Sequence, residues 1–225
     1  MNRSRYIKYA IGEIFLVVVG ILIALSINNL NESLKERKKE KLTIGILSEE
    51  IGKNLSSIKE DFGNNTQVLD SLALYLKGDL VKTNEYDKAQ FISYVLNYNW
   101  GILEYPTLEQ ELGPSRIIKN ASKLSASFKS LKTAHLTVDF RLNYLNELFN
   151  NQTVPYLLDA GAGSDLVSAM FQNKPDVPKL SSLYGTESLN NILSIQQLFL
   201  TSYNRGIDAL IEQSKETLMI LGELE

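Results

Sequence analysis

The 225-residue sequence contains no cysteine and a single histidine, His135. The absence of thiols excludes disulfide bonds, cysteine-ligated zinc, iron–sulfur clusters and thiol nucleophiles. One imidazole excludes multi-histidine metal or haem sites and leaves at most one histidine base. The sequence shows no constellation of nucleophile, base and metal ligands, so we expect no cofactor, no metal and no enzyme.

An excess of basic charge is also missing. The 23 basic and 26 acidic residues give a net charge of −3, so no global basic surface exists to neutralise nucleic-acid phosphates. We therefore expect no nucleic-acid partner. The content of 44% hydrophobic and 22% charged residues is typical of a globular chain, and the length suits one domain with an appendage.

A single long apolar run lies near the N-terminus. Residues 10–27 read AIGEIFLVVVGILIALSI, and Glu13 is their only charge. About 18 helical residues span roughly 27 Å, close to the thickness of a bilayer core. The run passes into Asn28 and Asn29 without a small-x-small cleavage site, which favours a retained transmembrane helix over a signal peptide.

The run divides the chain into four expected regions. These are a basic tail (1–9), the transmembrane helix (10–27), a charged helical neck (28–43) and a helical bundle domain (44–225). Glu32, Glu36 and Glu40 interleave with basic residues in the neck, and we expect i,i+4 pairing to hold it as a solvated helix. Charge counting favours a cytoplasmic C-terminal domain, but a large domain can translocate largely regardless of charge, so the residues leave the orientation open.

A segment near the N-terminus carries a family resemblance. The stretch from Lys8 to Glu40 reads KYAIGEIFLVVVGILIALSINNLNESLKERKKE. It resembles the opening of a family of uncharacterised single-span proteins of Gram-negative bacteria, known only as a domain of unknown function, with a Tyr-Ala-Ile-Gly-Glu-Ile lead and a span ending in Ile-Asn-Asn. The sequence departs from that pattern at Leu30, where a Trp is expected, and at Ser26, where a Gln is expected. A shorter segment, residues 113–124, resembles the family's Gly, Ile-Ile-x-Asn and Leu pattern.

The resemblance implies a single-pass protein of the bacterial inner membrane with a helical extramembrane domain. It favours a periplasmic location for that C-terminal domain. It implies no activity and supplies no catalytic residue.

The remainder of the chain is patterned as amphipathic helices. Strand signals are sparse, which predicts an all-α fold in which the N-terminal transmembrane helix continues into an extramembrane antiparallel bundle. One seam alternates spacings of four and three, as in a coiled coil: Leu124, Phe128, Leu131, His135, Val138, Leu142, Leu145 and Phe149. Leu136, Phe140 and Leu148 widen this apolar face, which favours packing inside a globular bundle over an isolated two-stranded coil.

Breakers and caps predict the early helix boundaries. We expect the first helix to end at residues 63–65, Gly-Asn-Asn, and a short helix to cover residues 66–77 before Gly78. Asn84 is expected to cap the next helix.

Later boundaries follow similar signals. Thr107 with Gln110 predicts a capping box for a short helix that ends at Gly113. A glycine-rich turn with Ser164 as N-cap is expected before a short helix near residues 166–171, and a long helix is expected from Thr186 to about residue 222.

One candidate interaction site is a face of the membrane helix. Glu13, Val17, Gly20, Ala24 and Asn28 share roughly one side, and Gly20 with Ala24 forms a small-xxx-small pair that would let a neighbouring helix approach. The alternative for Glu13 is that its side chain reaches the lipid headgroups, because it lies only about one turn inside the run.

A second candidate site is aromatic. Tyr94, Tyr98, Trp100 and Tyr105 cluster near one connection and could line a ligand or partner surface, the alternative being aromatic core packing. His135 has no second ligand residue at helical spacing, so we expect a core or rim histidine.

Two functional classes remain open. The first is a membrane-anchored helical interaction or scaffold protein, an accessory subunit of a bacterial envelope complex, whose partners are membrane lipid and either other membrane subunits or a second copy. The second is a periplasmic sensory or small-ligand-binding helical module that acts through a partner.

Overall fold

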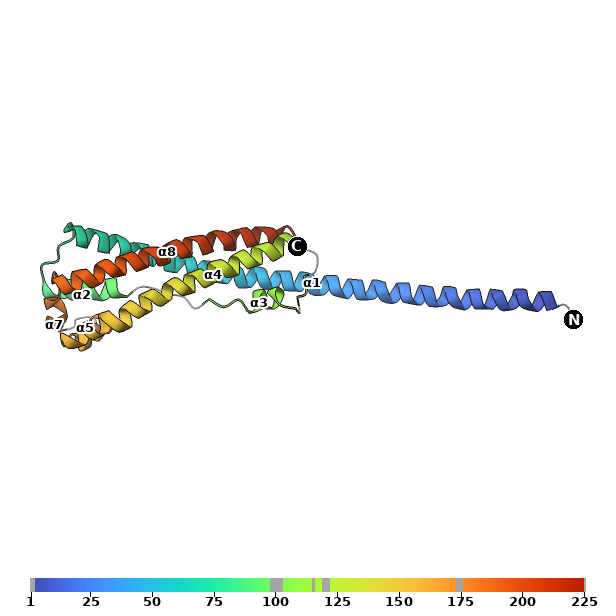
Figure 1. Cartoon of the computed structure of the whole chain (residues 1–225), viewed down its shortest axis with the longest axis horizontal. Helices are drawn as coiled ribbons and strands as arrows, with labels where there is room; N and C mark the ends of the chain where they lie inside the picture. The colour runs from blue at the N-terminus through green and yellow to red at the C-terminus, as the bar shows by residue number, and fades with distance from the viewer. Residues whose placement is uncertain (1–2, 98–102, 115, 119–121, 173–175, 225) are drawn as a thin grey trace.

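The computed structural model describes residues 3–97, 103–114, 116–118, 122–172 and 176–224. Within these residues every regular element is a helix, which confirms the all-α prediction. Figure 1 shows a long single helix that ends in a bundle, with the N-terminus at the far end of the single helix and the C-terminus beside the point where that helix enters the bundle.

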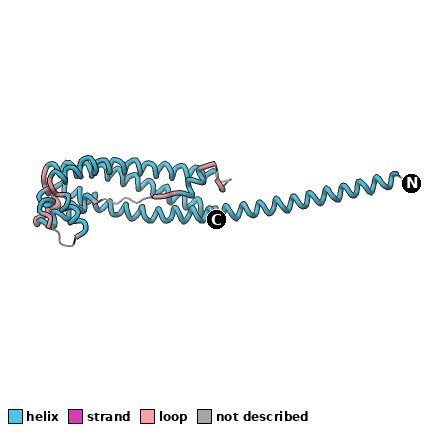
Figure 2. The backbone as a smooth tube through the Cα atoms, turned by 90° about the horizontal axis from the view of Figure 1, so that it is seen from below, coloured by secondary structure: helices cyan, strands magenta, loops and turns pink. Residues whose placement is uncertain are grey.

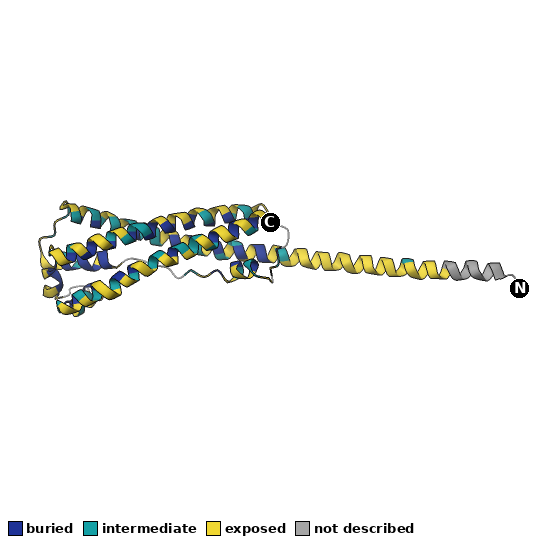
Figure 3. Ribbon diagram, in the orientation of Figure 1, coloured by how far each residue is buried: buried dark blue, intermediate teal, exposed yellow. Residues whose placement is uncertain are grey.

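Helix α1 runs without a break from Arg3 to Lys77 and comprises 75 residues. At about 1.5 Å per residue it is roughly 112 Å long. Figure 3 shows that its N-terminal part is exposed where it is described and that its C-terminal part contributes to the buried core. The first buried residues of α1 are Thr43 and Ile44.

The predicted helix end at residues 63–65 is wrong, because α1 passes through them. Asn65 is fully buried, and the Thr66 hydroxyl bonds to the Phe62 carbonyl (2.7 Å) within the helix. Asn204 of the facing helix donates to that same Thr66 hydroxyl (3.1 Å). A glycine inside a helix costs about 1 kcal/mol, which burial on both sides of this point outweighs. The helix ends instead at Gly78, which adopts φ +82°.

The bundle has an up-down-up-down path. After α1, helix α2 (Glu85–Leu96) and helix α3 (Pro106–Leu112) lead back along the bundle, helix α4 (Ser122–Leu148) runs outward again, and helix α8 (Glu187–Gly222) returns. Two short helices thus share the place that one long helix occupies in a regular four-helix bundle.

Side-chain contacts fix α8 between α1 and α4, antiparallel to both. Tyr75 at the end of α1 donates to Asn190 near the start of α8 (2.6 Å). Ser127 near the start of α4 shares a buried hydrogen bond with Thr217 near the end of α8 (2.7 Å). Further along α4, Arg141 donates to the Ser202 carbonyl (2.6 Å).

Short elements close the end of the bundle that lies away from the single helix (Figures 1 and 2). The π-helical segment η1 (Phe149–Thr153) leads into α5 (Val154–Asp159), where Pro155 has no N–H to continue α-helical bonding. Helices α6 (Gly163–Phe171) and α7 (Pro178–Ser182) follow. The prediction that Ser164 caps α6 is wrong, since Ser164 lies inside that helix. The next residue, Asp165, accepts hydrogen bonds from the Lys179 and Leu180 amides at the start of a different helix, α7.

Two further cap predictions have opposite outcomes. Asn84 caps α2 as expected, since its side chain accepts from the Asp87 amide at 2.7 Å. The capping box at Thr107 is wrong: no side chain of the local segment caps α3. The Glu50 carboxylate of α1 accepts from the Thr107 and Leu108 amides at 3.0 and 3.2 Å. Because this cap comes from another helix, the residues near Thr107 in the sequence do not indicate it.

The predicted α4 seam forms the core contact, but the apolar face is narrower than expected. Five seam residues are buried: Leu124, Phe128, Leu131, Val138 and Leu145. Leu148 is also buried, whereas Leu136 and Phe140 are exposed, so the prediction that they widen the packed face is wrong. Helix α8 covers one side of α4 and leaves that flank open to solvent.

Candidate functional site

The five residues of the predicted membrane-helix face all lie on the exposed part of α1. Glu13, Val17, Gly20, Ala24 and Asn28 are each exposed, and a Cβ added at Gly20 would meet no atom within 4 Å. The described part of the chain therefore places nothing against this face. Asn28 donates to Glu32 one turn further on (3.2 Å).

The direction of this face follows from helix geometry. Residues 18 positions apart lie on the same side, because 18 is five turns at about 3.6 residues per turn. Glu49 is 36 positions after Glu13, and Lys53 is 36 positions after Val17. Each pair therefore lies on the same side of α1. The Glu49 and Lys53 side chains are 66% and 74% exposed and pair with each other at 2.6 Å.

The core side of α1 is different. Over residues 44–58 the buried residues are Ile44, Leu47, Ile51, Leu55 and Ile58, which share one side of the helix. The predicted face, continued along the helix, therefore points away from the bundle. A neighbouring helix could lie along it without meeting the bundle.

The neck is a single uncovered helix. From the end of the apolar run at Ile27 to the first buried residue, Thr43, is about 16 residues, or roughly 24 Å of helix. Nearly every residue between them is exposed. The neck therefore separates the apolar run from the bundle.

The expected i,i+4 pairing in the neck is wrong. Residues four apart carry like charges: Glu32, Glu36 and Glu40 follow one another in this way, as do Lys35 and Lys39. Like charges at this spacing destabilise an isolated helix by a few tenths of a kcal/mol per pair. The acidic and the basic residues of the neck therefore lie along separate lines of the helix surface. The four-residue spacing of the glutamates already indicates this arrangement in the sequence.

Of the four aromatic residues predicted to share one surface, the two that the structure describes, Tyr94 and Tyr105, lie apart. Tyr98 and Trp100 lie outside the described residues. Tyr94 is exposed on α2, whereas Tyr105 is buried immediately before α3. Gln196 of α8 donates to the Val95 carbonyl beside Tyr94, and Ser214 of α8 adjoins Tyr105. These α8 residues are about 18 positions apart, so the two tyrosines are separated by roughly 27 Å along the bundle.

Tyr105 and the lone histidine meet inside the bundle. The Tyr105 and His135 rings have centroids 5.1 Å apart in an edge-on arrangement, and His135 Nε2 lies 3.6 Å from the Asp139 carboxylate. Burial raises the pKa of the Tyr105 phenol to about 12, the charges of Glu50 and Asp139 act in the same direction, and the polar side chains of Ser214 and Asn54 oppose it. Within the described residues the phenol oxygen has no hydrogen-bond partner. The arrangement keeps Tyr105 protonated and suits packing.

An aromatic cluster that the sequence analysis missed closes the other end of the bundle. Tyr75, Phe91 and Tyr184 are in mutual ring contact at centroid distances of 4.8–5.8 Å. The Tyr184 hydroxyl donates to the Leu80 carbonyl and accepts from the Lys82 amide. The rings come from α1, from α2 and from the turn between α7 and α8, and Tyr184 lies more than 90 positions from the other two, so no local spacing predicts the cluster.

Neither of two hollows in the described part of the chain is an enclosed ligand cavity. One hollow runs along the bare side of α1 between Val19 and Leu30 and is open to the surroundings. Another, beside Glu111 and Phe128, measures about 10 Å³, which suits no more than one water molecule. Among the described residues, no group of three or more His, Asp or Glu side chains could hold a metal ion.

These features define the class of the molecule: an all-α protein with one helix near its N-terminus that is long and apolar enough to cross a membrane. Comparisons of the chain with protein-family models, curated proteins and solved structures find no match. The function therefore has to be argued from α1 and the bundle themselves.

Proposed function

We propose that the protein is a non-enzymatic, membrane-anchored interaction or scaffold protein that serves as an accessory subunit of a bacterial envelope complex. The observation that carries the proposal is the exposed N-terminal part of α1. This part of α1 contains a stretch that is apolar on every side, and none of that stretch is buried within the molecule. A charged neck that the bundle leaves uncovered follows it. A helix that is apolar all round requires lipid or other apolar helices around it.

The anchor is proposed to cross the inner membrane once, with the bundle in the periplasm. The family resemblance supports this orientation, whereas the distribution of basic residues opposes it. Because the chain has no cysteine, a single cysteine at the exposed Ser188 of α8 reports the location of the bundle. Labelling by a membrane-impermeant maleimide in cells with an intact inner membrane is the expected result. Labelling only after that membrane is permeabilised would place the bundle in the cytoplasm.

Assembly tests the interaction role. Replacing Gly20 with Leu puts a large side chain on the side of α1 that points away from the bundle and blocks close approach of a second helix. Ser26→Leu is the matched control, because Ser26 lies 18 positions before the buried Ile44 and so faces the other side.

The readout is the size of the complex that accompanies the full chain from native membranes in mild detergent. We expect Gly20→Leu to reduce that complex and Ser26→Leu to preserve it. A chain that migrates alone in the wild type, or a complex that both variants leave intact, would overturn the proposed helix contact.

A further inference from the structure

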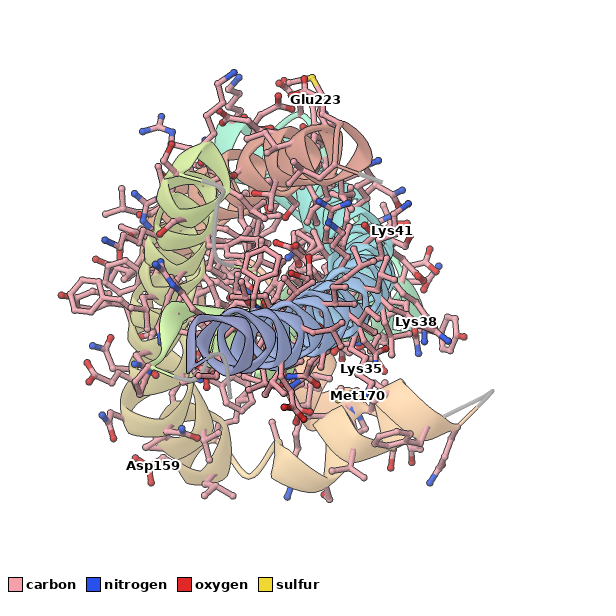
Figure 4. The ribbon with its side chains drawn as sticks, turned by 90° about the vertical axis from the view of Figure 1, so that its right-hand side faces the viewer. Lys35, Lys38, Lys41, Asp159, Met170 and Glu223 are labelled. Carbon is pink, nitrogen blue, oxygen red and sulfur yellow. The ribbon has the colours of Figure 1, made fainter. Side chains whose placement is uncertain are left out.

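The face of the span that points away from the bundle continues into the neck with a definite chemistry. Asn31, Lys35 and Lys38 lie on it, since Asn31 is 18 positions before the exposed Glu49 and Lys35 is 18 before the exposed Lys53. Figure 4 shows Lys35, Lys38 and Lys41 on the side of α1 away from α4 and α8. The exposed Leu34 and Leu42 border these lysines. We call Asn31, Lys35 and Lys38, with the bordering Leu34 and Leu42, the outward basic face.

The acidic residues of the neck are on the other side. Glu32, Glu36 and Glu40 lie 18 positions before Glu50, Asn54 and the buried Ile58, which face α3 and the core. No glutamate lies four positions from Lys35 or Lys38, and Glu32, three positions before Lys35, accepts a hydrogen bond from Asn28 instead. Neither Lys35 nor Lys38 forms an ion pair with any residue of the part of the chain that the structure describes.

We propose that the outward basic face docks the acidic juxtamembrane segment of a second, different single-span protein, helix against helix. The inference rests on the proposed interaction role and names the chemistry of the partner. Gly20 and Ala24 allow close approach within the bilayer on the same side, so one partner helix can follow α1 from the membrane into the neck. Leu34 and Leu42 supply apolar contacts between the charges.

A second copy of this chain does not fit the same face. Two copies in one membrane run parallel and at the same height, so each neck lysine would meet its own counterpart. Like charges placed against each other oppose association, whereas an acidic segment is attracted to the same lysines. The bundle does not obstruct a partner along the neck, because α1 first becomes buried at Thr43, beyond Lys35 and Lys38.

The test uses defined probes in detergent micelles. Two designed single-span peptides share a Leu/Ala span and differ in the juxtamembrane helix, which carries three glutamates in one and three lysines in the other. The full-length protein is labelled at Ser33→Cys, a position 18 residues before the buried Ile51 and therefore off the outward basic face. Energy transfer between the two labels measures binding.

We expect the acidic peptide to bind about tenfold more tightly than the basic one at low salt, the size expected for a few exposed charge pairs. The preference should shrink in about 0.5 M salt, where screening acts within a few ångströms. The double variant Lys35→Glu/Lys38→Glu should reverse it. As a matched pair of single variants with equal change of net charge, Lys38→Glu should weaken the preference, and Arg37→Glu, 18 positions before the buried Leu55 and therefore off the face, should retain it.

Three results would overturn the proposal. Equal binding of both peptides would show that the face does not recognise the charge of its partner. Self-association of two labelled copies as tight as acidic-peptide binding makes a second copy the occupant. Loss of the preference when phosphatidylglycerol is added to the micelles assigns the face to lipid headgroups. A reduced complex in Gly20→Leu together with equal peptide binding would leave the interaction role standing and remove only this inference.

Discussion

The two halves of α1 belong to one continuous helix but lie in different surroundings. In the bundle half, apolar residues recur along one side, and Leu47, Ile51 and Leu72 are fully buried. In the other half the apolar residues are continuous around the helix, and Leu22 and Ile23 are each more than half exposed. A single apolar stripe packs against protein, whereas a helix that is apolar on every side is suited to lipid. The distribution of apolar residues, rather than their number, distinguishes the two halves.

Removing the span tests this comparison with the largest expected effect. On the proposed membrane anchoring, deletion of residues 1–27 should move the protein from the membrane fraction to the soluble fraction with its helices intact, because the remaining apolar residues are periodic and face inward. Ultracentrifugation followed by circular dichroism of the supernatant measures both properties. Aggregation, or a spectrum without helix, would show that the bundle depends on the span.

Matched leucine substitutions compare the halves directly. Leu47→Ala removes a side chain with no solvent exposure and should lower the free energy of unfolding by about 3 kcal/mol. Leu30→Ala, at a position 63% exposed, should change it by less than about 0.5 kcal/mol. Urea unfolding of the full-length protein in micelles, followed by circular dichroism, gives both values. Similar losses in the two variants would mean that the neck is covered.

A smaller effect concerns the buried phenol. The pKa of Tyr105 is about 12 in the folded protein against an ordinary 10. The folded state therefore retains a proton that the unfolded state releases, so stability is lost as the pH rises from 10 towards 12. By pH 11 this amounts to about 1.4 kcal/mol.

The measurement compares wild type with Tyr105→Phe between pH 9 and pH 11. Other titrating groups affect both proteins equally, so the difference between the two unfolding free energies isolates the phenol. The wild type should lose about 1.4 kcal/mol more than the variant. Parallel pH profiles would place the Tyr105 hydroxyl in contact with solvent.

The comparison of halves also shows which features were predictable from sequence. The apolar run, the α4 seam and the Asn84 cap depend on residues within a few turns of one another, and each was predicted. The Glu50 cap of α3 and the contact of Tyr75 with Tyr184 join residues more than 50 positions apart, so no local spacing indicated them. The break expected at residues 63–65 does not occur, because burial of apolar residues on either side, such as Ile58 and Val68, outweighs the low helix propensity of Gly63-Asn64-Asn65.

The candidate site was predictable in part for the same reason. The span residues Glu13, Val17, Gly20 and Ala24 share a face by spacing alone, and that assignment needed no tertiary information. The direction of the face became visible only from the burial of Leu47 and its neighbours. Tyr94 and Tyr105 were grouped because they are close in sequence, whereas the structure places Tyr94 on the exposed side of α2 and buries Tyr105 before α3, beside Ser214 of α8.

The central claim is that α1 is one rigid helix that joins the span to the bundle. The absence of native cysteines allows two spin labels to be placed without background, at Ser26→Cys in the span and Ser56→Cys on the exposed side of α1 in the bundle. Thirty residues of unbroken helix separate these sites by about 45 Å at 1.5 Å per residue. Double electron–electron resonance on the full chain in a lipid nanodisc should give one narrow distance distribution near that value. A broad distribution or a clearly shorter distance would show a break in the neck and contradict the account.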